Sequence, residues 1–159
     1  MRKIQQLLRE YGERHQNPTN KRVHWICVPL IFFSIVAMVW SIPAVSLQNL
    51  VNSQSPFVNW ATLILFLVFI YYVTLSVPLA FGMLAFSALC LVASFGLSQL
   101  NFLPVWGLAL IIFIIAWIGQ FYGHKMEGKK PSFFKDVQFL MIGPAWLMHF
   151  IFKRLGIDY

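Results

Sequence analysis

From Val23 through His124 the chain contains no Asp, Glu, Lys or Arg. A soluble sequence is about 25% charged, so a stretch of this length would ordinarily carry roughly 25 charged residues. Moving one charge to the centre of a bilayer costs about 2.5–3.5 kcal/mol on insertion scales. A long run without charges is therefore what repeated crossing of a membrane requires, and it predicts an integral membrane protein.

The charged residues lie in three short segments, which are residues 1–22, 125–136 and 153–159. A net charge of +7 could by itself indicate a nucleic-acid-binding protein. The positive residues flank apolar segments, however, and no DNA- or RNA-binding motif is present. The pattern agrees with the positive-inside rule and with attraction to anionic headgroups. We therefore expect membrane lipids as partners and no nucleic acid.

The apolar pattern predicts an all-α integral membrane protein that forms a single domain over residues 1–159. Residues 1–16 place apolar side chains at helical spacing and charged ones on the other faces, which predicts an amphipathic helix at the membrane interface within an arm over residues 1–22. Four transmembrane helices are expected within residues 23–122: Val23–Ile42, Asn59–Ser76, Pro78–Leu97 and Pro104–Tyr122. A tight turn at Val77-Pro78 separates the second from the third.

Four crossings return the chain to the side on which it started. The basic loop over residues 123–136 then joins the basic N-terminus, and the excess of Lys and Arg places both in the cytoplasm. Residues 137–152 fall short of the ~20 residues that a span needs, and Gly143-Pro144 interrupts them. We expect a broken or re-entrant helical segment there. A bacterial inner membrane is the favoured location, or the endoplasmic reticulum if the protein is eukaryotic.

The candidate chemistry lies in four histidines at the edges of the charge-free run: His15, His24, His124 and His149. His24 begins the first predicted span and His124 ends the fourth, so both are expected at the same depth near the cytoplasmic surface. Imidazole suits Fe, Zn and Cu, so convergence of these side chains predicts a mononuclear metal site. His15 could instead be a solvated interface residue, and His149 an ordinary half-buried histidine. Ligand type alone does not separate iron from zinc.

Several polar residues are placed to support such a site. Tyr11 and Asn20 each precede a histidine by four residues, which puts each pair on one helical face, and Asn17 lies in the turn between them. Glu127 follows His124 by three residues and could bind the metal, orient an imidazole, or pair with lysines at the rim. Three lysines could dock a substrate carboxylate or form a solvated positive-inside cluster: Lys125, Lys129 and Lys130.

Three motifs carry a family resemblance: Tyr11-x3-His15-x-Asn17-Pro18-x-Asn20-x3-His24-x4-Pro29, Trp117-Ile-Gly-Gln-Phe-Tyr-Gly-His124-Lys125-x-Glu127-x3-Pro131-Ser132, and Ile142-Gly143-Pro144. The chain resembles the membrane 2-hydroxy fatty acid dioxygenases named for metabolism of phytosphingosine to odd-numbered fatty acids. The resemblance implies an Fe(II)-dependent enzyme that uses O2 to cleave C1 from a long-chain 2-hydroxy fatty acid. It implies roles for His15, His24 and His124, which lie inside the motifs, whereas His149 follows the last one.

Two other functions compete with this hypothesis. A non-catalytic lipid-binding or scaffolding membrane protein would use the basic face to recognise anionic headgroups. A small proton-coupled transporter is disfavoured because no predicted span has a charged residue at mid-depth, where coupling residues usually lie. Loss of metal and of turnover on replacing His24 and His124 would separate the enzyme from the scaffold.

Overall fold

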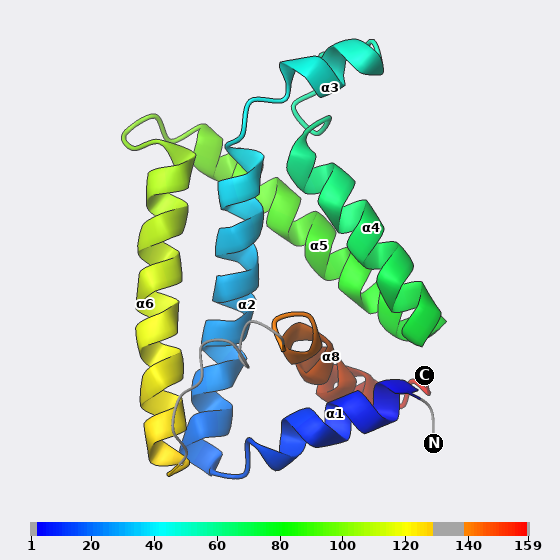
Figure 1. Cartoon of the computed structure of the whole chain (residues 1–159), viewed down its shortest axis with the longest axis vertical. Helices are drawn as coiled ribbons and strands as arrows, with labels where there is room; N and C mark the ends of the chain where they lie inside the picture. The colour runs from blue at the N-terminus through cyan, green and yellow to red at the C-terminus, as the bar shows by residue number, and fades with distance from the viewer. Residues whose placement is uncertain (1–2, 129–138, 159) are drawn as a thin grey trace.

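The computed structural model describes residues 3–128 and 139–158, and within them the chain is entirely helical (Figure 1). The helices have the following bounds: α1 Lys3–Glu13, α2 Pro18–Trp40, α3 Val45–Leu50, α4 Trp60–Leu75, α5 Val77–Ser98, α6 Val105–Met126 and α8 Ile142–Leu155. Figure 1 shows α2, α4, α5 and α6 running between the two ends of the molecule in alternating directions, with α1 and α8 lying across one end. The all-α prediction is confirmed for the described residues.

Among the described helices, three are long and apolar enough to cross a membrane, and they are α2, α5 and α6. The prediction of four full-length spans is therefore wrong. The expected second span corresponds to α4, whose 16 residues measure about 24 Å along the axis, less than the ~30 Å of a hydrocarbon core. The predicted span, residues 59–76, was longer than the helix because Asn59 and Ser76 cap α4 and lie just outside its helical residues.

The helix α2 begins at Pro18, five residues before the predicted start of the first span. Asn17 caps it, since the Asn17 side-chain oxygen accepts hydrogen bonds from the backbone N–H groups of Thr19 (2.8 Å) and Asn20 (3.3 Å). Proline suits this position because the first helical residue needs no N–H partner. The two basic residues Lys21 and Arg22 therefore lie inside the first turns of α2 rather than in a connecting arm.

The helices α2 and α6 approach each other closely because α6 carries glycine at two positions one turn apart. A Cβ atom on Gly119 would lie 2.5 Å from Cys27 Sγ, and one on Gly123 would lie 2.5 Å from Asn20 Oδ1. Small residues spaced by four allow this approach between apolar helices. The contact places the start of α2 against the end of α6, with Trp117 packed into the same interface.

The turn between α4 and α5 is as short as predicted, with Ser76 alone between the two helices. The Ser76 hydroxyl accepts the hydrogen bond of the Leu79 backbone N–H at 3.5 Å and so caps α5. At the same end of α4, the buried Tyr72 hydroxyl donates to the backbone carbonyl of Met141. This bond ties the α4–α5 hairpin to the segment that leads into α8.

The predicted amphipathic helix is present as α1, and its apolar face is covered by protein. Ile4, Leu8 and Tyr11 are buried in a core cluster that they share with Trp146 and Leu147 of α8. The charged residues of α1 occupy the opposite face, where Arg9 Nε lies 3.4 Å from Glu13 Oε1. The helix α1 therefore packs against α8 and lies across one end of the long helices (Figure 1).

The prediction of a broken C-terminal segment is wrong for the described part, residues 139–158. Helix α8 is continuous through Gly143 and Pro144, because both lie in its first turn, where proline removes no intrahelical hydrogen bond. It ends at Gly156, whose φ of +67° is a left-handed conformation that glycine adopts without strain. The part of the expected segment at residues 137–138 lies outside the described residues.

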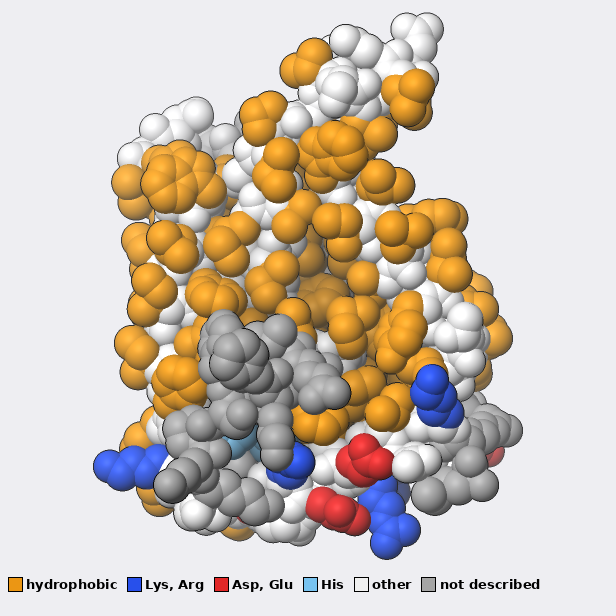
Figure 2. All heavy atoms as spheres, viewed as in Figure 1, with side chains coloured by type: hydrophobic (Ala, Val, Ile, Leu, Met, Phe, Trp, Pro, Cys, Tyr) orange, Lys and Arg blue, Asp and Glu red, His pale blue; other side chains and the backbone are white. Residues whose placement is uncertain are grey.

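Hydrophobic side chains cover most of the face drawn in Figure 2, and charged side chains gather at the end where α1 lies. The opposite end holds α3 and the two uncharged connections predicted from the sequence. Many exposed side chains of α4, α5 and α6 are large and apolar; examples are Leu67 (57% exposed), Val92 (59%) and Ile115 (62%). This distribution is the one expected of helices that face lipid.

Candidate metal centre

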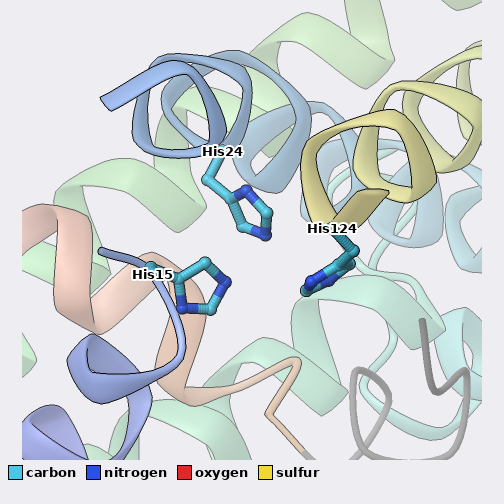
Figure 3. Close-up of side chains that lie close together, drawn as sticks. All are labelled: His15, His24 and His124. Atoms are coloured by element: carbon cyan, nitrogen blue, oxygen red, sulfur yellow. The ribbon is translucent and has the colours of Figure 1, made fainter. Parts of the chain in front are cut away.

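Three histidines from three separate segments meet at the charged end of the long helices (Figure 3). His15 lies in the link between α1 and α2, His24 lies in the second turn of α2, and His124 lies in the last turn of α6. Their exposed fractions are 3%, 1% and 7%. Three imidazoles removed from water and pointing at a common space are a donor set suited to a transition metal.

The distances between the rings are short. Ring centroids lie 4.2 Å apart for His15 and His24, 5.1 Å for His24 and His124, and 5.7 Å for His15 and His124. One ring nitrogen from each residue lies within 4.8 Å of the other two. Two nitrogens bound to one ion at about 2.1 Å can be at most about 4.2 Å apart. A pair of nitrogens at the 4.8 Å limit would therefore have to close by at least about 0.6 Å around an ion.

Two of the imidazoles are oriented in the same way by backbone carbonyls. His15 Nδ1 lies 2.7 Å from the Tyr11 carbonyl oxygen, and His24 Nδ1 lies 2.9 Å from the Asn20 carbonyl oxygen. A carbonyl only accepts, so in each neutral imidazole Nδ1 carries the proton and Nε2 keeps its lone pair. A hydrogen bond of this kind fixes the tautomer that metal-binding histidines use.

Aromatic side chains support the His15 ring from the side of α1 and α8. The Tyr11 ring stacks on it, with centroids 4.3 Å apart and planes 19° apart. The Trp146 ring lies 5.6 Å from His15 and 5.3 Å from Tyr11. The contact of α1 with α8 therefore determines where the His15 imidazole lies, although His15 itself belongs to neither helix.

Glu127 joins the end of α6 to the start of α2. Its carboxylate accepts hydrogen bonds from the backbone N–H of Gln16 (2.8 Å), the backbone N–H of Asn17 (2.9 Å) and the side-chain amide of Asn20 (2.9 Å). Asn17 adds a bond from its own amide to the Met126 carbonyl at 3.2 Å. These hydrogen bonds of Glu127, here named the latch, hold the segment between His15 and His24 against α6.

The sequence-predicted site residues divide into those that meet and those that do not. Seven of them lie at this centre or in the contacts that hold it: His15, His24, His124, Tyr11, Asn17, Asn20 and Glu127. His149 lies elsewhere, half-buried on α8 with its ring 5.2 Å from that of Phe150. Burial and then the neighbouring Lys153 ammonium lower the pKa of His149. Lys125 is exposed in the last turn of α6, and Lys129 and Lys130 lie outside the described residues.

Two residues of the centre, Gln120 and Trp146, were not predicted from the sequence. Gln120 lies one turn before His124 on α6, is 6% exposed, and its Oε1 accepts no hydrogen bond from any described residue. A polar side chain inside an apolar span at i−4 from a histidine was a signal that could have found it. Trp146 had no comparable signal, because its contact with His15 depends on how α8 packs.

Beside His24 and Gln120 there is a cavity of about 20 Å³, which we call the histidine cavity. Tyr11, Gly143 and Leu140 also line it. One water molecule needs about 10–15 Å³ of this measure, so the space accommodates a molecule no larger than water or dioxygen as it stands. The polar groups of the centre therefore open onto a small, mostly apolar space.

Comparison with known proteins shows the family of the chain. The family described as 2-hydroxy-palmitic acid dioxygenase Mpo1-like matches residues 1–155. The chain is 32% identical over 146 residues to a Saccharomyces cerevisiae protein named 2-hydroxy-palmitic acid dioxygenase MPO1, an alignment that covers 90% of this chain and 76% of the yeast protein. No solved structure matches the chain.

Proposed function

Because the chain belongs to the 2-hydroxy-palmitic acid dioxygenase Mpo1-like family, we propose that it is a membrane dioxygenase acting on long-chain 2-hydroxy fatty acids. In this proposal Fe(II) is held by His15, His24 and His124, and the enzyme removes C1 to give an acid one carbon shorter. The observation that carries the proposal is the meeting of three buried imidazoles from distant parts of the sequence.

The residues present fit a ferrous ion with open positions. The group of potential ligands within reach of one another contains three imidazoles and, among the described residues, no carboxylate or thiolate. Three neutral ligands leave the ion its full charge, which a buried site must balance with an anion. The carboxylate of a 2-hydroxy acid supplies that anion, and its hydroxyl supplies a further oxygen ligand. When bound, Fe(II) would supply the means to activate O2 beside the substrate.

The reaction balances without a further reductant. A 2-hydroxy acid and one O2 give the shortened carboxylic acid, CO2 and water, with the C1–C2 bond broken and four electrons passing from the substrate to O2. The protein contributes position and protection from water. Gln120 is placed to hydrogen-bond the substrate, because its buried oxygen gains a donor from the 2-hydroxyl and so avoids the cost of an unpaired polar group.

We place the histidine end at the cytoplasmic surface of the membrane. The charged residues gather there, and Lys21, Arg22 and Lys125 lie at the ends of the helices that carry His24 and His124. The positive-inside rule assigns such an end to the cytoplasm. A fatty acid would then present its carboxylate at the surface while its alkyl chain stays in the hydrocarbon region.

The test is to purify the chain in detergent, measure its metal by elemental analysis, and incubate it with Fe(II), O2 and a long-chain 2-hydroxy acid. We expect about one iron per chain and formation of the acid one carbon shorter. His24→Ala and His124→Ala should lose both, whereas His149→Ala should keep both. A fully folded protein that neither retains a transition metal nor shortens the acid would refute the proposal.

A second candidate function rests on a separate groove on the α2–α8 side. This groove, of about 780 Å³, is lined by Lys21, Lys153 and Arg154 together with Trp25, Trp146 and Phe150. Cations beside aromatic rings suit an anionic lipid headgroup at a membrane surface. If the protein is a lipid-binding scaffold, binding to anionic vesicles should survive His24→Ala and depend on these cations, and no metal should be needed.

A further inference from the structure

An apolar cavity of about 180 Å³ lies between α2 and α4. Its walls come from Phe32 to Val39 of α2, from Ala61 to Val68 of α4, and from Leu140 and Met141, and each lining side chain is a hydrocarbon or thioether. Figure 2 shows the surface between these two helices hollowed and covered with hydrophobic side chains. We propose that this cavity, here named the acyl groove, binds the alkyl chain of the 2-hydroxy acid and that its far end limits chain length.

The acyl groove adjoins the histidine cavity, because Leu140 lines both. The histidine cavity itself borders His24 and Gln120. A ligand whose polar head lies at the histidines would therefore enter the acyl groove by displacing Leu140. This inference rests on the proposed function, because it takes the histidines as the site of the head group.

The distance from His24 to the far end of the acyl groove calls for a long alkyl chain. Val39 lies fifteen residues after His24, which is about 22 Å along the axis of α2. One leaflet of a bilayer is about half of the ~30 Å hydrocarbon core, so chains of membrane lipids extend roughly 15 Å. An acid with its head at His24 therefore reaches the end of the groove, at Val39 and Ala61, only if its extended chain is about 7 Å longer than this.

The volume of the acyl groove also suits part of an alkyl chain. An apolar cavity of about 150 Å³ binds benzene, so about 180 Å³ holds a segment of roughly six carbons. The histidine cavity of about 20 Å³ would have to widen around Leu140 to admit the head group and the carbons between. Buried CH2 groups contribute about 0.8 kcal/mol each. The groove therefore supplies both affinity and a physical end point for the chain.

The other apolar spaces fit this role less well. The α2–α6 interface is closed, since Gly119 and Gly123 bring the two helices into direct contact. A cavity of about 130 Å³ between α2 and α8 shares no lining residue with the histidine cavity. The large groove beside Trp146 carries three cations, which alkyl groups avoid. Only the acyl groove, among these spaces, is both apolar and adjacent to the centre.

The first experiment maps the chain directly and does not depend on turnover. A 2-hydroxy fatty acid with a diazirine at mid-chain is photolysed with the full-length protein in detergent, and labelled residues are identified by mass spectrometry. We expect labels within 32–39 of α2 and 61–68 of α4, removed by excess unlabelled acid. Competed labels found instead on the lipid-facing side of α6, for example at Ile115, would overturn the proposal even if the enzyme is active.

The second experiment shortens the acyl groove from its far end. Ala61→Phe and Val39→Phe should shift the preferred substrate toward shorter acids, with about 10-fold or greater loss on the longest ones, since a single methylene changes discrimination by about 10–200-fold. Leu67→Phe is the matched control, because Leu67 is on α4, 57% exposed, and outside the groove. Val39 is only partly buried, so that variant remains informative if Ala61→Phe does not fold.

The outcomes separate the two proposals. Wild-type protein that binds iron and shows competed labels in the acyl groove without shortening the acid would contradict the proposed reaction and support the groove. Active protein whose chain-length profile is the same in Val39→Phe, Ala61→Phe and Leu67→Phe would contradict the groove and leave the reaction standing.

Discussion

The two sides of α2 are packed in opposite ways. Toward α6 the interface is closed, with Gly119 and Gly123 so near α2 that an added Cβ would overlap Cys27 or Asn20. Toward α4 the interface is open and encloses about 180 Å³ of apolar space. The closed side carries the histidines, which need positions fixed to a fraction of an ångström. The open side faces a space that suits a flexible hydrocarbon chain, whose recognition depends on shape and area.

Among the variants that test the difference between the two sides of α2, removal of a histidine from the closed side should have the largest effect. His24→Ala deletes one of three candidate ligands, so iron affinity should fall by more than the ~10–100-fold that loss of a supporting hydrogen bond causes, and turnover should be lost. Metal content by elemental analysis and product by mass spectrometry check it. In His149→Ala, the matched control on α8, iron and turnover should persist; loss of iron there as well would show that the centre extends beyond the three imidazoles.

The next largest effect should come from opening the closed interface itself. Gly123→Ala places a Cβ where Asn20 Oδ1 now lies, so we expect about 1–3 kcal/mol of destabilisation and weaker metal binding. Gly96→Ala in α5, where nothing lies within 4 Å of an added Cβ, should be neutral or slightly stabilising. Thermal unfolding in detergent measures both. Equal behaviour of the two variants would mean that the α2–α6 contact is not tight in solution.

A smaller effect is expected from the latch. Glu127→Gln replaces one acceptor oxygen by an NH2 group, so whichever way the amide lies, the backbone N–H of Gln16 or the side-chain amide of Asn20 loses its acceptor, at a cost of about 1–3 kcal/mol. Because the latch holds the segment between His15 and His24, iron affinity should fall about 10-fold while chain-length preference is unchanged. Equilibrium iron titration measures the first quantity and a substrate series the second. A change confined to chain length would contradict the assignment of Glu127 to the closed side.

The smallest effect concerns His149 and pH. Its pKa is lowered in the folded protein, so the folded state binds fewer protons than the unfolded state, and its contribution to stability is present above pH 6.5 and is lost as pH falls below that value. His149→Gln should therefore reduce the loss of stability between pH 7 and pH 5 relative to wild type. Unfolding midpoints at several pH values check this. A steeper loss in the variant would reverse the sign of the argument.

Much of the helical pattern and of the centre was predictable from charge alone. The charge-free run begins beside His24 and ends at His124, so the cost of charge in lipid predicted both histidines at a membrane surface. In the structure the two rings do meet, with centroids 5.1 Å apart. The tight turn before α5 was equally visible, because proline and a preceding polar residue interrupt an otherwise continuous apolar run; the turn lies at Ser76, one residue before the predicted Val77-Pro78. These features depend on local sequence and on the energetic cost of charge in lipid.

The remaining features depend on contacts between distant residues. Hydropathy could not show that α4 is short, since its caps Asn59 and Ser76 are uncharged and compatible with a span. Gly143-Pro144 suggested a break, but whether such a pair interrupts a helix or begins it depends on where the first turn lies. Asn20 was expected to help through its side chain, whereas its backbone carbonyl orients His24. Glu127 acts through residues more than a hundred positions away.

Glu127 is more than a hundred positions away in the sequence from the residues that it binds, Gln16, Asn17 and Asn20. This separation also affects the order in which parts of the centre are synthesised. A ribosome adds about 5–20 residues per second, so several seconds pass between synthesis of His24 and synthesis of Glu127. During that interval α2 lies in the membrane without its closest neighbour, and His15 and His24 have no third histidine beside them. A prematurely terminated chain lacking α6 would therefore have only two of the three candidate ligands, and loading of the proposed metal would be delayed until translation is nearly finished.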